Sequence, residues 1–330
     1  MPNRRKFLQQ SSTLALASLF LPRLGQAAAA AARAAGTGMP WGPKADMPIG
    51  LQLYTMGELM TTDPKGTLQK LAAIGFKEME SAGSAKGNYY GFTPKEFAAM
   101  VSDAGMHWRS AHIAGAPFSM AQIMKMAKTA DDSARIQKYM ERMKDRPKTA
   151  NLKENYQQIA DEAAAGGLSY VVCSSIPVNT MDEIKTAVDV FSKAGEACKK
   201  NGVQFAYHNH VTEFDAVEGV RPFDYILTNT DKDLVKMELD LAWATKAKQD
   251  PVELFKLHPG RYPLWHVKDL DKEKLQPAEV GSGVVDFKRI FDNAAESGVK
   301  YFFVEQDGAP QPFQNVANSY GYLKNTLAQG

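Results

Sequence analysis

The sequence predicts an α/β protein built as a (β/α)8 barrel, and three observations support this prediction. The chain has 330 residues, of which 44% are hydrophobic, enough for one barrel or for two modest domains. Eight apolar runs recur along it, most of them about 30 residues apart, the length of one strand–helix unit. Helical patterns lie between the runs. This strict alternation favours a closed TIM barrel over a doubly wound sheet of fewer strands.

The expected strands are apolar runs that mostly follow a glycine or a turn. In chain order they cover residues 49–56, 75–80, 105–113, 167–175, 202–210, 234–240, 262–269 and 298–306. Between them, apolar residues recur at helical spacing and a glycine ends the pattern. The clearest of these helices are expected at 65–75, 94–105, 153–167 and 182–202.

One interval between expected strands is longer than the others. Between His112 and Leu168 the chain adds a Met-rich, charged helical segment, in which the methionines are more typical of packing than of a binding face. We therefore expect a single barrel over residues 41–330, with a helical loop insertion around 115–150 that covers the barrel mouth.

Residues 1–35 have the pattern of an export signal with an Ala-rich linker. Arg4 and Arg5 precede the apolar run 13–21, and the alanines that follow offer a cleavage site for signal peptidase. Paired arginines followed by Phe-Leu resemble a twin-arginine signal. The pattern predicts a periplasmic protein that the twin-arginine translocase exports in its folded state, without a stable membrane anchor. The alternative is an N-terminal amphipathic helix.

Removal of this signal would change the charge balance. Cleavage in the alanine run before Arg33 would remove Arg4, Arg5, Lys6 and Arg23 and no acidic residue, so 39 basic residues become 35 against 37 acidic ones. A mature chain that is slightly negative lacks the basic surface that nucleic-acid binding needs. Cys173 and Cys198 fall in an expected strand and in the helix after it, so buried free thiols are favoured over a disulfide. Composition leaves a homodimer open.

Polar side chains gather at the carboxyl ends of the later strands. Because side chains alternate along a strand, each of four strands has a set of residues on one face, and this face would point into the barrel. They are Ala206, His208 and His210; Lys236, Glu238 and Asp240; Leu264, His266 and Lys268; and Phe303, Glu305 and Asp307. TIM-barrel enzymes place their chemistry at this end.

Imidazoles and carboxylates buried together at such a mouth need a cation. Left unpaired, each buried charge would cost several kcal/mol. The pattern therefore predicts one divalent metal. Mixed histidine and carboxylate ligation suits Mn²⁺, Co²⁺, Fe²⁺ or Zn²⁺ and disfavours Ca²⁺, which prefers oxygen ligands.

Several strings of the second half carry a family resemblance. They are 207-YHNHVTEF-214, 237-MELDLAW-243, 264-LWHVKD-269, 279-EVGSGVVDF-287 and 303-FVEQD-307. In this order they resemble the sugar phosphate isomerase/epimerase family, which has the xylose-isomerase-like TIM barrel of the endonuclease IV-type superfamily. The superfamily includes ketose 3-epimerases, inosose dehydratases and lyases acting on 3-keto-glycosides. DNA repair is disfavoured here by the export signal, by the charge and by a total of only six histidines.

The resemblance also implies a ligand set. In the family's ketose epimerases, Glu, Asp, His and Glu from strands five to eight hold one metal. The last three positions fall on Asp240, His266 and Glu305, and the first falls on His208. Because the epimerases use both glutamates as acid and base, a histidine at the first position argues against symmetrical epimerisation.

The resemblance thus implies a one-sided, metal-assisted proton abstraction next to a sugar carbonyl. Glu305 is the expected base, and His210, Glu80 or Lys268 is expected to return a proton. Residues expected to contact the sugar are Tyr54, Glu80, His112 and Trp243. Export favours a non-phosphorylated ketose or keto-glycoside as substrate. Two alternatives stay open: a 3-keto-glycoside lyase or dehydratase that uses the same metal site, and a non-catalytic periplasmic carbohydrate-binding barrel.

Overall fold

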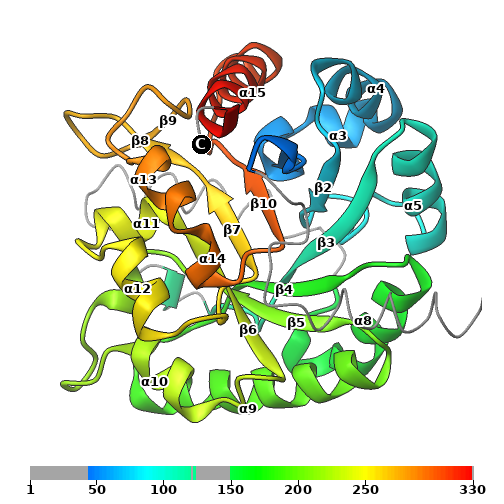
Figure 1. Ribbon diagram of the computed structural model, residues 1–330. Helices are drawn as coiled ribbons and strands as arrows, with labels where there is room; N and C mark the ends of the chain where they lie inside the picture. Colours follow the sequence, from blue (N-terminus) through cyan, green and yellow to red (C-terminus); the bar gives the residue numbers. More distant parts are fainter. Residues whose placement is uncertain (1–43, 120–121, 124–148, 329–330) are drawn as a thin grey trace, which may run out of the picture. The chain divides into compact units, whose positions relative to one another are not determined.

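The computed structural model describes residues 44–119, 122–123 and 149–328. The expected export signal and most of the expected loop insertion lie outside these residues. Eight parallel strands close into a barrel in the order β1-β10-β7-β6-β5-β4-β3-β2 (Figure 1). They are β1 (Gly50–Gln52), β2 (Glu78–Ser81), β3 (His107–Ala114), β4 (Tyr170–Ser175), β5 (Gln204–His208), β6 (Val235–Asp240), β7 (Leu264–Val267) and β10 (Tyr301–Val304). Each overlaps one of the eight expected strands, so the predicted fold is confirmed.

Helices surround the barrel (Figure 1). They are α3 (Leu59–Thr62), α4 (Pro64–Ile74), α5 (Pro94–Asp103), α8 (Leu152–Ala165), α9 (Met181–Lys200), α10 (Pro222–Asn229), α11 (Leu241–Lys246), α12 (Pro251–Leu257), α13 (Phe287–Asp292), α14 (Ala294–Ser297) and α15 (Pro312–Ala328). Short 3₁₀ turns occur at η1 (Lys44–Asp46), η2 (Leu53–Met56) and η3 (Thr212–Phe214). The four helices named from the sequence correspond to α4, α5, α8 and α9.

Local sequence explains where these helices begin. The side chains of Asp63, Thr93, Asn151 and Thr180 each accept a hydrogen bond from a backbone N–H in the first turn of α4, α5, α8 and α9. Such caps satisfy N–H groups that have no partner inside the helix. In α4 and α5 the first residue is proline, which lacks an N–H and has the φ angle a helix needs.

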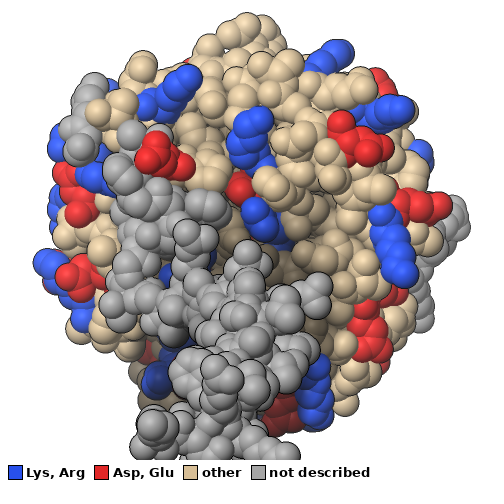
Figure 2. Space-filling model, turned by 45° about the vertical axis from the view of Figure 1, so that its right-hand side comes forward, with Lys and Arg blue, Asp and Glu red and all other residues tan. Residues whose placement is uncertain are grey.

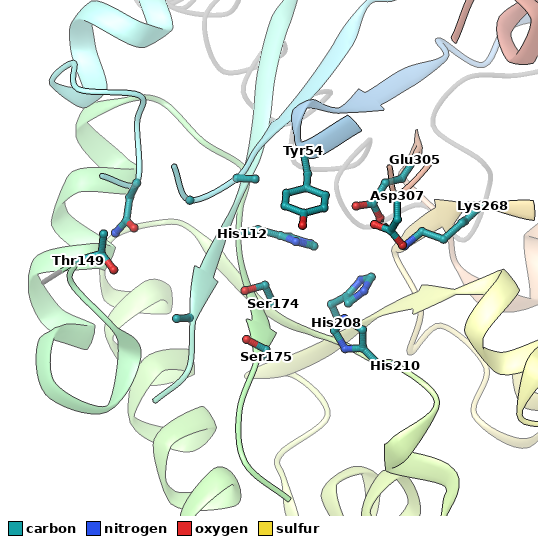
Figure 3. Close-up of a pocket in the computed structure, with 14 residues that line it drawn as sticks. Tyr54, His112, Thr149, Ser174, Ser175, His208, His210, Lys268, Glu305 and Asp307 are labelled. Atoms are coloured by element: carbon teal, nitrogen blue, oxygen red, sulfur yellow. Dashed lines mark hydrogen bonds and ion pairs between the residues drawn. The ribbon is translucent and has the colours of Figure 1, made fainter. Parts of the chain in front are cut away.

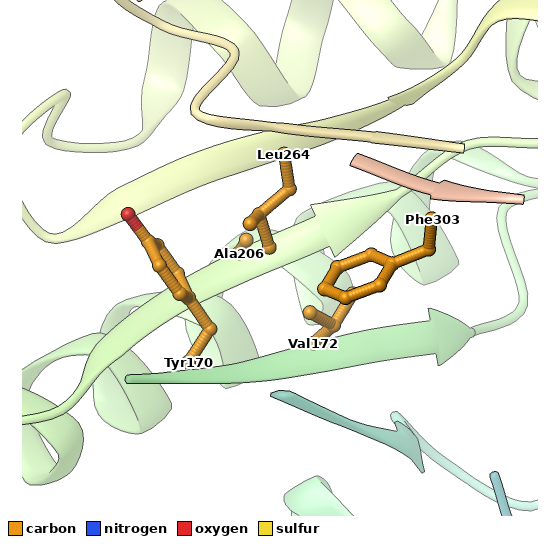
Figure 4. Packing of buried hydrophobic residues seen from close by; sticks show 5 residues of the cluster. All are labelled: Tyr170, Val172, Ala206, Leu264 and Phe303. Atoms are coloured by element: carbon orange, nitrogen blue, oxygen red, sulfur yellow. The ribbon is translucent and has the colours of Figure 1, made fainter. Parts of the chain in front are cut away.

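The barrel interior is apolar at its lower end. Tyr170, Val172, Ala206, Leu264 and Phe303 form one buried cluster contributed by four strands (Figure 4). Four of them, Val172, Ala206, Leu264 and Phe303, stand two residues before a polar side chain of the barrel mouth on the same strand face. The interior therefore changes from apolar to polar within two residues along each strand, as the alternation predicted. The packed apolar cluster thus forms the bottom of the polar layer.

After β7 the chain forms a small hairpin that the sequence did not predict. β8 (Asp269–Leu270) pairs antiparallel with β9 (Pro277–Ala278). The carboxylate of Asp269 then accepts hydrogen bonds from the backbone N–H groups of Leu270, Gly281, Gly283 and Val285 at 2.8–3.1 Å. One buried carboxylate thus organises the 281-GSG-283 loop.

The two cysteines do not form a disulfide, as the sequence led us to expect. Cys173 in β4 and Cys198 in α9 are both buried free thiols, and burial raises the pKa of each, that of Cys198 to about 12.

On the face shown in Figure 2, basic and acidic side chains are interspersed rather than separated by sign. Among the described residues, no helix combines the length and the apolar character needed to span a bilayer.

Candidate active site

A pocket of about 390 Å³ opens where the barrel strands end (Figure 3). This volume lies in the range of small-molecule sites. Six residues singled out from the sequence line it: Tyr54, His112, His208, His210, Lys268 and Glu305. Four others do not line it: Glu80, Asp240, Trp243 and His266.

Asp240, His266 and Glu305 come together beside the pocket. One ligating atom from each lies within 4.8 Å of the other two. Asp240 ends β6 and caps α11, since its Oδ1 accepts the Trp243 N–H at 2.8 Å. Its other oxygen, Oδ2, is buried and has no hydrogen-bond partner. Burial raises the pKa of Asp240, and Lys268 opposes the shift.

The imidazole of His266 joins two carboxylates. Its Nδ1 lies 2.7 Å from Oε2 of Glu305, and its Nε2 lies 2.6 Å from Oε1 of Glu80. Glu80 is fully buried and also accepts hydrogen bonds from Gln52 at 2.8 Å and Ser110 at 2.5 Å. Burial alone would lower the pKa of His266, but the carboxylates raise it well above its ordinary value. Glu80 therefore orients this ring from below, rather than facing the pocket.

The ammonium group of Lys268 lies among three carboxylates. Its Nζ is 2.9 Å from Glu305 Oε2, 2.8 Å from Asp307 Oδ2 and 3.4 Å from Asp240 Oδ2. It also lies 4.9 Å from the centre of the Trp243 ring. Burial would raise the pKa of Glu305, but Lys268 and His266 lower it well below its usual range. Glu305 is therefore ionised at neutral pH.

A second cluster lies around Glu238, one pleat below Asp240. The Oε2 atom of Glu238 is 2.6 Å from Nε2 of His112 and 3.1 Å from Nδ1 of His208 and Nε2 of His266. Its Oε1 atom is buried without a hydrogen-bond partner. Burial and the neighbouring Glu80 raise the pKa of Glu238 to about 7. Strand alternation placed Glu238 on the inward face, but the family motif assigned no role to it.

His208 lies between the two clusters. Its Nδ1 faces Glu238, whereas its Nε2 is 3.9 Å from Asp240 Oδ2. The ligating atoms of His208 group with His112, Glu238 and His266, and not with Asp240 and Glu305. Burial, together with His266 and His112, lowers its pKa well below the ordinary value. The expected four-ligand set is thus divided between two neighbouring groups.

At the pocket rim, His210 and Tyr54 are partly open to solvent. The side chain of His210 is 43% exposed. Its Nδ1 atom lies 3.8 Å from the buried carboxylate of Glu213. Glu213 also accepts hydrogen bonds from the His210 backbone N–H at 2.9 Å and the Tyr207 hydroxyl at 2.7 Å. Tyr54 is 57% exposed on η2. Both side chains are labelled around the pocket in Figure 3.

The pocket also contains polar groups that the sequence did not single out. Asn88, Ser174 and Ser175 line it, the two serines from the end of β4. The signal that locates these serines is their place at a strand end, since the residues themselves carry no distinctive pattern.

The residues of the site fit a divalent ion. Four buried carboxylates, from Glu80, Glu238, Asp240 and Glu305, are balanced by one permanent cation, Lys268, and by shared imidazoles. Two carboxylate oxygens in this volume lack a hydrogen-bond partner, and such atoms are costly unless something binds them. Imidazole and carboxylate together suit a transition metal.

Comparison with known proteins identifies the family. A family model described as a xylose isomerase-like TIM barrel matches residues 68–326. The chain belongs to this family. A structure of a sugar phosphate isomerase/epimerase from Parabacteroides distasonis ATCC 8503 shares 29% identity with this xylose isomerase-like barrel, with a TM-score of 0.65 over 84% of this chain and 93% of that one. The resemblance stated from the sequence motifs is confirmed.

Two further proteins that resemble the xylose isomerase-like barrel have different names and activities. The structure of an L-ribulose 3-epimerase has the same fold, with 14% identity and a TM-score of 0.61 over 86% of this chain and 95% of its own. The inosose dehydratase of Lacticaseibacillus casei is 25% identical over 183 residues, which span 49% of this chain and 61% of that enzyme. The proteins similar in sequence to this chain therefore include one named sugar phosphate isomerase/epimerase and one named inosose dehydratase.

Proposed function

We propose that this protein is a divalent-metal-dependent enzyme that removes a proton next to the carbonyl of a non-phosphorylated keto-sugar or keto-glycoside. The observation that carries the proposal is the group formed by Asp240, His266 and Glu305 beside a pocket of small-molecule size. The buried Oδ2 of Asp240 accepts no hydrogen bond from the described residues and has the Lys268 ammonium group as an ion-pair partner at 3.4 Å. A divalent ion held by these three residues would polarise the substrate carbonyl and make the adjacent proton more acidic.

Glu305 is the residue placed to accept that proton. It is ionised, since Lys268 and His266 lie 2.9 Å and 2.7 Å from its Oε2, and it lines the pocket. A base must begin in its deprotonated form and within reach of the substrate. Lys268, which contacts the same carboxylate, keeps it in place.

His210 is the residue placed to return a proton elsewhere on the substrate. Its ring is half-open to the pocket, and the buried carboxylate of Glu213 fixes the backbone and faces the ring. A carboxylate behind an imidazole selects its tautomer and leaves the other nitrogen for the substrate. Glu305 and His210 come from β10 and from the end of β5, so acid and base approach the substrate from different strands (Figure 3).

The charges of the pocket support a substrate without a phosphate group. Lys268 is the sole lysine or arginine among the described residues that line the pocket, and three carboxylates already surround its ammonium group. Phosphate recognition normally uses free cationic groups or helix N-termini. A neutral sugar needs only the hydroxyls and amides that Asn88, Ser174 and Ser175 supply.

Elimination is a second candidate outcome of the same first step. His208 stands where the family's ketose epimerases have a second glutamate. The pocket therefore has one carboxylate base, Glu305, and one imidazole acid, His210, instead of two glutamates. A base paired with an acid suits loss of water or of a glycosidic leaving group. The match to inosose dehydratase agrees with this outcome.

Proton exchange in D₂O, followed by NMR with Zn²⁺-loaded or Mg²⁺-loaded protein, tests the proposal. The substrates are a panel of free ketoses and 3-keto-glycosides. We expect loss of the proton signal next to the carbonyl, slowed about 10²–10⁴-fold in Glu305→Gln. Glu253→Gln, which changes an exposed residue paired with Lys256, is the matched control. A product lacking water or the aglycone identifies elimination. Sugar binding without any exchange would contradict the enzyme and support the binding barrel.

Export to the periplasm belongs to the same proposal and rests on the Arg4-Arg5 pattern. Fractionation of cells that produce the full chain should find the mature protein in the periplasm. The Arg4→Lys, Arg5→Lys double variant should retain it in the cytoplasm, and retention of the unchanged chain would refute export.

A further inference from the structure

We propose that the barrel holds a second divalent-metal site, formed by His112, His208 and Glu238, beneath the group of Asp240, His266 and Glu305. Ligating atoms of His112, His208, Glu238 and His266 all lie within 4.8 Å of one another. Neither the sequence motifs nor the family comparison assigns a metal to Glu238 or His112.

Three imidazoles surround the carboxylate of Glu238. Nitrogens of His112, His208 and His266 surround a single oxygen of Glu238 at 2.6–3.1 Å. The rings of His112 and His266 are stacked with an interplanar angle of 9°, and the His208 ring meets both at steeper angles. Two of these rings, His112 of β3 and His208 at the end of β5, thus approach the Glu238 carboxylate from different strands, close enough for all three residues to share one ion.

One oxygen of the Glu238 carboxylate is buried without a hydrogen-bond partner in the described part of the chain. Glu238 is fully buried and its Oε1 has no hydrogen-bond partner among the described residues. A buried carboxylate oxygen without a partner destabilises the folded protein unless something binds it. A divalent ion bound to the carboxylate of Glu238 would satisfy both of its oxygens.

His266 separates the two sites rather than serving both. A neutral imidazole offers one lone pair to a metal, and its other nitrogen carries a proton. With Nδ1 directed to the group of Glu305, the Nε2 of His266 donates its proton to Glu80 at 2.6 Å. A carboxylate behind a ligating histidine is the usual supporting arrangement. His112, His208 and Glu238 remain as three ligands for the lower ion, with a position open to substrate or water.

The two sites differ in the metal they prefer. The lower site offers two imidazoles and one carboxylate, and the upper group offers two carboxylates and one imidazole. Imidazole-rich sites favour Zn²⁺, whereas carboxylate-rich sites also suit Mn²⁺ and Mg²⁺. His112 and His208 line the pocket, which gives an ion a route to the lower site.

Metal content after chelation and equilibrium dialysis against Zn²⁺ tests this proposal, since it needs no substrate. We expect two zinc ions per chain in the unchanged protein, one in Glu238→Gln and one in Asp240→Asn. The double variant should bind none, and Glu253→Gln should bind two. Circular dichroism and thermal melting show whether each variant is folded.

Each outcome separates the lower site from the proposed function. One zinc ion in the unchanged protein, retained in Glu238→Gln and lost in Asp240→Asn, would overturn the lower site and leave the proposed function intact. A single ion lost in Glu238→Gln and retained in Asp240→Asn would support the lower site and contradict the upper one. If Glu238→Gln does not fold, His112→Asn removes a ligand that is partly open to the pocket. X-ray absorption of the zinc-loaded, unchanged protein should also show about one and a half nitrogens per ion from histidine, averaged over His112, His208 and His266.

Discussion

The Nζ atom of Lys268 lies 2.9 Å from the carboxylate of Glu305, and both side chains are almost completely buried. This ion pair occupies the side of the pocket where the sequence predicts a metal ligand. Lys268 and a divalent ion therefore attract the same carboxylates, and each weakens the binding of the other.

Lys268→Met should reveal this competition. Without its partner, the buried carboxylate destabilises the metal-free protein by about 3–5 kcal/mol. Affinity for Zn²⁺ should rise, because the ion no longer meets a neighbouring positive charge. Urea unfolding with chelator and zinc titration measure the two effects. Lys256→Met, which breaks an exposed pair with Glu253, is the control and should change stability by less than about 1 kcal/mol. Unchanged or weaker zinc binding in Lys268→Met would refute the competition.

Glu213→Gln should reduce turnover by changing how His210 is held. The backbone N–H of His210 loses a charged acceptor at 2.9 Å, and its ring loses the carboxylate at 3.8 Å. We expect kcat to fall and KM to stay nearly constant. The loss of kcat should be smaller than the roughly 10²–10⁴-fold loss expected for His210→Asn.

Tyr207→Phe provides the matched control for Glu213. It removes one hydrogen bond to the same carboxylate, at 2.7 Å, and leaves the charge in place. It should lower stability by about 0.5–1.5 kcal/mol and leave kcat nearly unchanged. Equal losses of kcat in Glu213→Gln and Tyr207→Phe would indicate a structural role alone.

Gly283→Ala should loosen the loop after β9. A Cβ atom there would lie 2.1 Å from the carbonyl oxygen of Leu270 and 2.3 Å from Oδ1 of Asp269. Relief of this overlap moves the loop from its carboxylate anchor at a cost of about 1–3 kcal/mol, seen as a lower melting temperature. Gly321→Ala, in α15 with open space around its Cβ, should instead leave stability unchanged or raise it. Equal effects of the two substitutions would contradict the anchor.

Stability should fall steeply in alkali. Burial raises the pKa of five tyrosines among the described residues above the ordinary value of 10.0. They are Tyr89, Tyr90, Tyr170, Tyr207 and Tyr262. A raised folded-state pKa means that the folded state keeps protons that the unfolded state releases. The contribution of these tyrosines to the free energy of unfolding is therefore complete below about pH 10, and it is lost as the pH rises further. Phenolate absorbance should show these tyrosines ionising only together with the loss of near-UV circular dichroism. Ionisation before that loss would contradict the prediction.

The fold was accessible from the sequence because barrel strands leave a strong local pattern. Apolar runs at regular intervals gave all eight strands, but not their lengths. The expected strand at 49–56 is reduced to Gly50–Gln52, because the side chain of Gln52 accepts the backbone N–H of Tyr54 and turns the chain into η2. The hairpin of β8 and β9 was missed because strands of two residues have no periodicity.

Side-chain alternation determined which residues of the candidate site face inward, and family motifs determined that Asp240, His266 and Glu305 belong together. Only the tertiary structure decided their partners. Strand register sets Asp240 beside His266 and His266 beside Phe303, and barrel closure brings Glu80, 186 residues away in sequence, to the other side of the same ring. The tertiary structure also decided that His208 faces Glu238 as well as Asp240. These contacts depend on register, closure and side-chain rotamers, which no local sequence pattern encodes.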